Sequence, residues 1–183
     1  RKMEGDDEGK EFFIYVHMPA DADVEPSEDS AEAGWAGDQI PELIKTHFAG
    51  GTLTDSAVRE HAHRAFGDRG SQLDVDAFRS AVAAGTVETF PLVHPCEANG
   101  YNGVYAYMDE CGLLKGLPRN ERASSLARVC GIDTAVFHGD VFFSRVRTKP
   151  EPARNVSLGL VDLSAEAAWL KRAPADNVAY HLE

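Results

Sequence analysis

Long hydrophobic runs are missing from this sequence of 183 residues. A helix that crosses a bilayer needs about 20 consecutive apolar residues. No run approaches that length, so we expect no membrane insertion. The opening stretch, RKMEGDDEGKEFFIYV, also lacks the pattern of a signal peptide, because acidic residues separate its basic residues from a short apolar run.

Cysteine is equally scarce, with only Cys96, Cys111 and Cys130 in the chain. Three widely spaced cysteines make neither a disulfide framework nor a CxxC metal knuckle. Their odd number allows at most one disulfide and favours a reducing compartment. We therefore predict an intracellular location, in the cytoplasm or the interior of an organelle.

Positive charge is scarce in the first part of the chain. Residues 1–42 hold 13 acidic and 3 basic side chains, whereas the rest holds 17 and 15. Binding to nucleic acid requires a surplus of positive charge that neutralises phosphates. The charge distribution therefore argues against a nucleic-acid partner.

The chain divides by pattern into three segments, the first of which is an acidic lead over residues 1–37. Its apolar stretch EFFIYVHMP has the form of a buried strand that ends at Pro19. The following ADADVEPSEDSAEAGWAGD is rich in carboxylates and small residues, which predicts an exposed loop. Within this loop Trp35 is the one large aromatic residue, and we expect it to fold back onto the protein.

Residues 38–85 show helical spacing and form the second segment. DQIPELIKTHFAGG predicts a helix that two glycines end, and TDSAVREHAHRAFG predicts a second helix. A third helix begins at Asp74 or Asp76 and stops at Gly85. Together they predict a small helical unit.

Residues 86–183 change to strand-like alternation. Strands are predicted in TVETFPLVHP, GVYAYMD and GDVFFSRVR, with a possible fourth in VSLGLVDL, and Ser164 is expected to cap a final helix. The predicted fold class is α+β, a small antiparallel sheet with a packed helix, preceded by the helical unit.

The stretch between the second and third strands carries the clearest local signals. Asp109 to Gly112 has turn chemistry, which predicts a hairpin with Leu113 and Leu114 in extended form. Asn120 can cap a helix in which small and apolar residues recur every three or four positions, which predicts that one helix face is buried. These residues are Ala123, Leu126, Ala127 and Cys130.

This part of the chain resembles a known family. TVETFPL, VYAYMDECGLLKGLPRNERASSLA and GDVFF are similar to uncharacterised small proteins of phages and bacteria that share a domain of unknown function. The likeness covers about residues 86–147 and is most specific in LPRNERA; a fainter likeness is to uncharacterised microalgal proteins. It implies a fold unit, and it implies no activity, because that family has none to carry over.

Several chemical motifs are incomplete. The stretch HRAFGDRGSQLDVDAF resembles the end of a calcium loop, but Phe66 and Ala77 occupy the positions of two essential ligands. His61 and His63 point in different directions on a helix and cannot chelate one ion. The remaining histidines considered, His17, His47, His94 and His138, are scattered, so a metal site would have to be assembled by the fold. We name no catalytic, metal or cofactor site.

Two functional hypotheses are left. The first is a non-catalytic protein-interaction module or accessory subunit of a larger assembly, with another protein or complex as partner and an exposed patch that includes Trp35, Tyr105 or Tyr107. The second is binding of a small anion, such as a phosphate or nucleotide, at the helix start, with or without catalysis. The residues that would bind the anion are Lys115, Arg119, Asn120 and Arg122.

Overall fold

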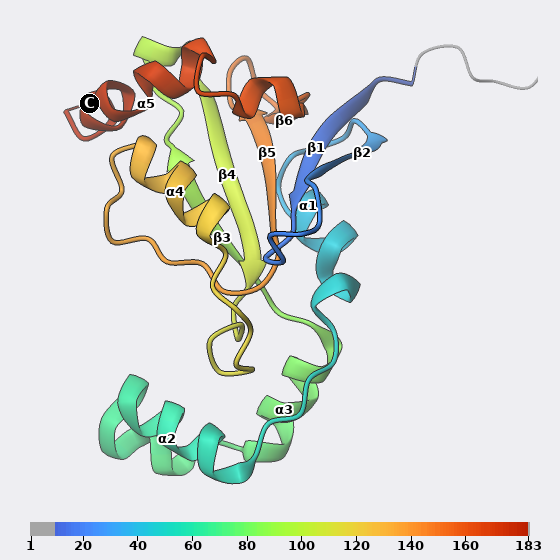
Figure 1. The fold of residues 1–183 in the computed structure, drawn as a ribbon, viewed down its shortest axis with the longest axis vertical. Coiled ribbons are helices and arrows are strands. Elements are labelled where there is room, and N and C mark those ends of the chain that lie inside the picture. Colours follow the sequence, from blue (N-terminus) through green and yellow to red (C-terminus); the bar gives the residue numbers. More distant parts are fainter. Residues whose placement is uncertain (1–9, 183) are drawn as a thin grey trace, which may run out of the picture.

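A six-stranded antiparallel sheet organises the protein, whose computed structural model describes residues 10–182 (Figure 1). The strand order is β2-β1-β5-β4-β3, and β6 pairs with β5 beyond the end of the β1 pairing. The strands are β1 (Phe12–Met18), β2 (Ser27–Glu32), β3 (Val87–Val93), β4 (Asn102–Asp109), β5 (Val141–Arg147) and β6 (Arg154–Val156). The α-helices are α1 (Gln39–Ile44), α2 (Asp55–Phe66), α3 (Val75–Ala84), α4 (Glu121–Val129) and α5 (Ala168–Tyr180). Short 3₁₀ helices are η1 (Lys45–Phe48), η2 (Gly67–Gln72), η3 (Glu97–Asn99) and η4 (Leu160–Leu163).

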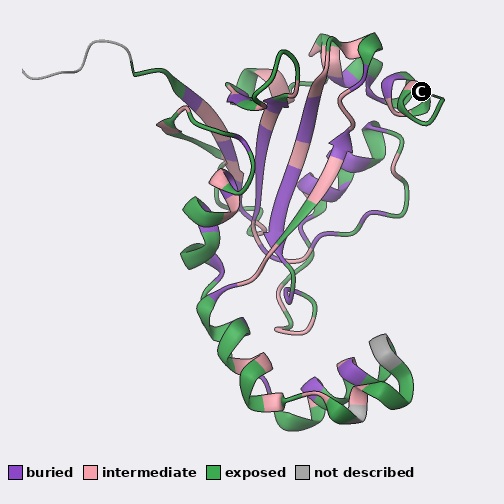
Figure 2. Ribbon diagram, turned by 180° about the vertical axis from the view of Figure 1, so that it is seen from behind, coloured by how far each residue is buried: buried purple, intermediate pink, exposed green. Residues whose placement is uncertain are grey.

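The fold is α+β, as the sequence predicts. Its two central strands, β4 and β5, are the most deeply buried part of the sheet (Figure 2). One face packs against α4 and α5 in an apolar cluster that includes Val104, Phe143, Leu126 and Leu170. On the other face α1 and η1 lie over an aromatic cluster. This second cluster contains Phe13, Ile40, Ile44, Phe48, Tyr107 and Phe142.

Helix α4 confirms the prediction from its sequence. The Oδ1 atom of Asn120 accepts a hydrogen bond from the amide of Ala123 at 3.0 Å, so Asn120 caps the helix. The predicted stripe of small and apolar residues faces the sheet and is buried. Burial raises the pKa of the Cys130 thiol to about 12, as expected for a core cysteine.

The prediction of an exposed loop after Pro19 is wrong in part, because Ser27–Glu32 form strand β2. Six residue pairs join β2 to β1, from Phe12 opposite Glu32 to His17 opposite Ser27. Residue types did not signal this strand, because an edge strand is held by backbone hydrogen bonds and its side chains stay exposed. Its carboxylates at Glu28, Asp29 and Glu32 discourage a further strand from pairing there. The sheet thus joins strands from the first and third sequence segments.

The predicted hairpin after Asp109 is wrong. Strand β4 already pairs with β3 on one side and with β5 on the other, so it has no free edge for a third partner. Residues 110–116 instead form consecutive turns. From these turns Cys111 and Leu114 pack against the helical unit, beside Val58 and Val82. Gly112 is needed for close approach, since a Cβ there would lie 2.6 Å from the carbonyl oxygen of His138.

The helical unit predicted over residues 38–85 contains only α2 and α3, which extend from one end of the sheet at the bottom of Figure 1, because α1 and η1 pack on the sheet instead. Thr54 caps α2 and Asp74 caps α3, so the first of the two predicted starts of the third helix is confirmed. Within residues 10–182, no helix combines the length and apolar character needed to cross a bilayer.

The last part of the chain differs from its prediction in two places. The possible fourth strand in VSLGLVDL, residues 156–163, is wrong: β6 spans Arg154–Val156 and ends where that stretch begins, and residues 160–163 form η4. The final helix begins after Ala167 rather than at Ser164, and no side chain caps it. It continues through Pro174 because Leu170 and Ala173 pack on the sheet cluster, and this burial offsets the lost backbone hydrogen bond.

Candidate metal centre

The pairing of β1 with β5 places a histidine beside an aromatic ring and a carboxylate. In this register His17 lies opposite Phe142, and Met18 lies opposite Val141. The imidazole of His17 stacks on the ring of Phe142 with centroids 4.5 Å apart and planes 14° apart. Asp140 directly precedes β5, so its carboxylate lies at the same end of the two strands.

A second histidine arrives from η1, which follows α1 along the chain. His47 lies at right angles to Phe142, with centroids 5.0 Å apart and planes 87° apart. Ile40, Ile44 and Phe48 hold this segment on the sheet by packing into the aromatic cluster. The fold therefore orients both imidazoles through contact with one buried phenyl ring.

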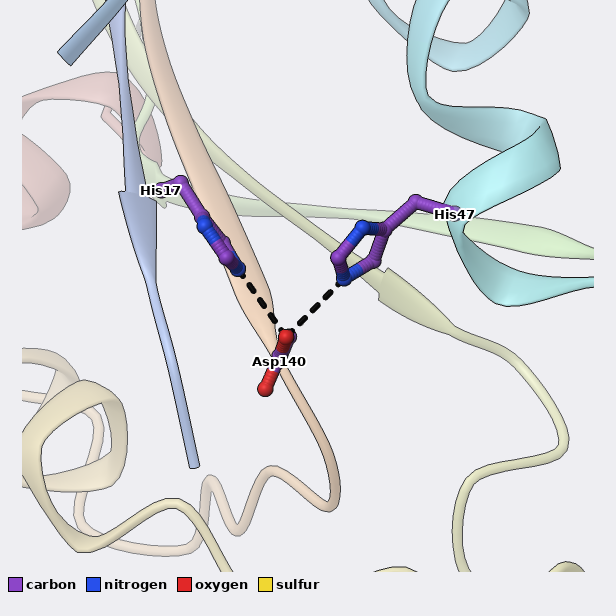
Figure 3. A group of neighbouring side chains, drawn as sticks. All are labelled: His17, His47 and Asp140. Atoms are coloured by element: carbon purple, nitrogen blue, oxygen red, sulfur yellow. Dashed lines mark hydrogen bonds and ion pairs between the residues drawn. The ribbon is translucent and has the colours of Figure 1, made fainter. Parts of the chain in front are cut away.

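The two imidazoles meet on a single carboxylate oxygen (Figure 3). Oδ2 of Asp140 lies 3.0 Å from Nε2 of His17 and 2.9 Å from Nε2 of His47. The other oxygen of Asp140, Oδ1, accepts a hydrogen bond from the amide of Ala20 at 2.9 Å. That amide fixes the orientation of the carboxylate, as second-shell donors do in metal sites.

These contacts change the acidity of Asp140. Burial alone would raise the pKa of its carboxyl, but the Ala20 amide and the hydrogen bonds from His47 and His17 outweigh burial and lower it. The carboxylate is therefore ionised at neutral pH. Two imidazoles and one carboxylate are a ligand set suited to first-row transition metals.

The separations approach those around a metal ion. Zinc binds imidazole nitrogen and carboxylate oxygen at about 2.0–2.2 Å, so two neighbouring ligand atoms of a tetrahedral site lie about 3.3–3.6 Å apart. The distances of 2.9 and 3.0 Å from Oδ2 to the two nitrogens are shorter than this spacing, and all three ligand atoms lie within 4.8 Å of one another. A shift of each proton from Nε2 to Nδ1 would turn both nitrogens into ligands.

A pocket of about 370 Å³ adjoins the centre, and His47 and Asp140 form part of its wall. Lys115 and Asp109 line the same pocket. Their side chains are only 5% and 2% exposed, and Nζ of Lys115 lies 2.7 Å from Oδ2 of Asp109. Nζ also donates to the carbonyl of Phe48 at 2.7 Å, which ties Lys115 to the residue after His47.

The structure does not gather the four residues expected to bind an anion into one open site. Lys115 forms the buried pair described above, while Nε of Arg119 lies 2.9 Å from a carboxylate oxygen of Glu121. Arg122 donates to the backbone carbonyls of Pro19, Asp21 and Val24. These three cations therefore have partners within the chain.

Asn120 is fully buried and bonded through its whole side-chain amide. Besides capping α4, its Nδ2 donates to the carbonyls of Met18 and Gly139 at 2.9 and 3.1 Å. It thus joins the residue after His17 to the residue before Asp140. Asn120 therefore holds together the two backbone segments that carry His17 and Asp140.

The three aromatic residues expected at an interaction surface are dispersed. Trp35 is 66% exposed, with its ring over Gly37, so it folds back only locally. Tyr105 is half-buried against the aromatic cluster. Tyr107 is buried with its hydroxyl 3.0 Å from that of Ser144, and burial raises its pKa to about 12. Tyr107 is therefore in the core and not on a surface patch.

The cysteines and the remaining histidines are not part of this centre. All three cysteines are buried with free thiols. The Nδ1 atom of His138 lies 3.1 Å from the carbonyl oxygen of Leu117.

Sequence reasoning missed the centre because its ligands lie 93 and 123 residues apart. The available signal was weak. In the predicted strand, Phe13, Tyr15 and His17 occupy every second position and therefore share one face. His47 lies on the apolar stripe of its predicted helix. Each pattern is also what a core histidine produces, and only the β1–β5 register together with the packing of η1 on Phe142 brings the two histidines to Asp140.

Comparisons with protein-family models, curated proteins and solved structures find no match to this chain. The likeness of residues 86–147 to phage and bacterial proteins therefore stays a prediction.

Proposed function

We propose that the protein binds a divalent first-row transition metal ion, Zn²⁺ or Fe²⁺, at His17, His47 and Asp140. The observation that carries this proposal is the convergence of two imidazole nitrogens and one carboxylate oxygen, from three separate chain segments, within 4.8 Å. Their residue types suit these metals, and the Ala20 amide orients the carboxylate.

The proposed centre belongs to the class that keeps open coordination positions. Structural zinc sites have four protein ligands, whereas catalytic sites have three and bind water or substrate at the next position. Among residues 10–182 the cluster offers three ligands, and two of them line a pocket. We therefore assign the centre to metal-assisted binding or activation of a small molecule.

Metal titration of the purified protein tests the proposal. After treatment with a chelator, calorimetry with Zn²⁺ should give one site per chain, and His47→Ala should weaken that site at least about 100-fold because it removes a ligand. Asp140→Asn should act in the same direction. His63→Ala on α2 is the matched control, because it removes an exposed histidine outside the cluster.

Two outcomes would contradict the proposal. One is the absence of stoichiometric binding of both Zn²⁺ and Fe²⁺, the latter measured without oxygen. The other is equal loss of affinity in His47→Ala and His63→Ala. Either result would reduce the cluster to a hydrogen-bonded contact between β1, η1 and β5.

A protein-interaction role is the second candidate, and the exposure of Trp35 favours it. Large aromatic residues are enriched where proteins bind one another. Native mass spectrometry of protein purified from its source would show a complex for the wild type and its loss in Trp35→Ser. A solitary monomer for the wild type would count against this role.

A further inference from the structure

The buried pair of Lys115 and Asp109 stands out because it forms part of the pocket that the metal centre borders. Burying two charges costs several kcal/mol per ion, and a buried pair typically adds little net stability. Its place in the pocket wall therefore calls for an explanation beyond folding.

We infer that this pocket binds a small carboxylate-bearing molecule whose carboxylate contacts both the metal and the Lys115 ammonium. This inference rests on the proposed metal site. It assigns Lys115 to ligand binding, and it identifies the ligand as a small organic monoanion.

The hydrogen bonds of Lys115 leave room for such a ligand. An ammonium group has three N–H donors. Within residues 10–182, Nζ meets two acceptors, the carbonyl of Phe48 and Oδ2 of Asp109, each at 2.7 Å. Among the described residues, no acceptor is seen for the third N–H, and Lys115 lines the pocket.

The charges that line the pocket limit the charge of the ligand. Three carboxylates, from Asp21, Asp109 and Asp140, and one ammonium line the pocket, which gives a formal charge of −2. A divalent metal brings this charge to zero. An anion is therefore repelled by the metal-free pocket, and after metal loading a monoanion adds less repulsion than a dianion.

Two glycines shape the wall above Lys115. Gly50 and Gly51 have φ angles of +91° and +93°, which residues with a side chain rarely adopt. A Cβ on Gly51 would lie 3.1 Å from Cδ of Lys115. The absence of side chains here lets the backbone pass close to the lysine stem while the pocket, at about 370 Å³, stays within the size range of small-molecule sites.

The test uses the Co²⁺-loaded full chain, because the visible absorption of Co²⁺ reports its ligands. Acetate should change this absorption in a saturable way, and at equal ionic strength it should bind at least 10-fold more tightly than the dianion sulfate. No acetate binding is expected to the metal-free protein, measured by calorimetry.

The double substitution Asp109→Asn/Lys115→Met tests the lysine. Lys115→Met alone would leave Asp109 buried without a counter-charge, whereas the double variant removes both charges and keeps an oxygen to accept from the Cys111 amide. Loss of one charge-assisted hydrogen bond should weaken acetate about 10- to 100-fold. Co²⁺ affinity should change by less than a factor of three.

The outcomes separate the two proposals. If Co²⁺ binds through His47 but acetate leaves its spectrum unchanged, the ligand inference fails and the metal site stands. If the double variant binds acetate as tightly as the wild type, or if its Co²⁺ affinity falls together with its acetate affinity, Lys115 does not contact the ligand. Its role would then be limited to holding η1 through the Phe48 carbonyl. If Co²⁺ does not bind, the ligand inference fails, and the Zn²⁺ and Fe²⁺ titrations decide the metal proposal. Should the double variant not fold, the comparison of acetate with sulfate on the wild type still decides whether the pocket takes a monoanion.

Discussion

Phe142 and Phe143 are neighbours on β5, yet they lie in different environments on opposite faces of the sheet. Phe143 is enclosed by apolar residues from α4, α5 and the adjacent strands. Phe142 is also buried, but it lies beneath His17 and His47 at the margin of the aromatic cluster. One face is an apolar core, whereas the other supports polar groups that can reach a ligand.

The difference lies in what covers each face. Two helices cover the first face, and the small side chains of Ala123 and Ala127 let α4 approach closely. The second face is covered by the short α1 and η1, so imidazoles reach the edge of the cluster and remain partly exposed. Incomplete cover over a rigid aromatic base is a physical setting in which a binding site can form.

The largest expected effect comes from breaking the apolar face. Phe143→Ala should lower the free energy of unfolding by about 3–5 kcal/mol, because it removes buried contacts and leaves a cavity. Urea denaturation measures this loss. Zn²⁺ affinity of the folded variant should stay close to that of the wild type; a large loss would show that the two faces are not independent.

A smaller and different effect is expected on the other face. Phe142→Leu keeps an apolar side chain but removes the ring on which His17 stacks. Its cost in stability should be less than that of Phe143→Ala, while Zn²⁺ affinity should fall about 10-fold, as for changes in residues that orient ligands. Calorimetry checks the second effect, and unchanged affinity would remove the orienting role of Phe142.

The smallest expected effect concerns His94, which lies away from the metal centre. Its ring stacks on Tyr180 at 4.1 Å and lies 6.1 Å from His181, and burial, helped by His181, lowers the pKa of His94 below 6.5. The unfolded chain therefore binds more protons at this position. Its contribution to stability is complete above pH 6.5 and is lost as pH falls through 6.5 toward the lower folded value.

Urea midpoints measured between pH 8 and pH 5 should reveal this contribution. The wild type should lose more stability on acidification than His94→Gln, and the difference between the two proteins isolates His94 from the other histidines. Parallel pH profiles would contradict the assignment.

Local signals predicted much of the fold. Asn120 and Asp74 act as helix caps, an apolar run located β1, and alternation located β3, β4 and β5, because these features depend on residues close together in the chain. The predicted hairpin failed for the opposite reason. Turn chemistry at Asp109 is local, but whether a strand has a free edge depends on β3 and β5, which lie elsewhere in the sequence.

The candidate sites also divide into features set by neighbouring residues and features set by distant segments. Lys115, Arg119 and Arg122 are close in sequence, which suggested one cationic site, but side-chain direction separates them into three different sets of contacts. Asn120 was correctly identified as a cap, whereas its second role depends on the carbonyls of Met18 and Gly139, which only the folded chain brings together.

By itself the sequence determined the α+β class, the starts of α3 and α4 at Asp74 and Asn120, and the buried stripe of α4, since each follows from periodicity and short-range hydrogen bonding. The tertiary structure alone decided the pairing of β2, the docking of the helical unit on Cys111 and Leu114, and the meeting of His17, His47 and Asp140. The physical reason is that strand register and packing are set by contacts between distant segments, and these leave no spacing pattern in the chain.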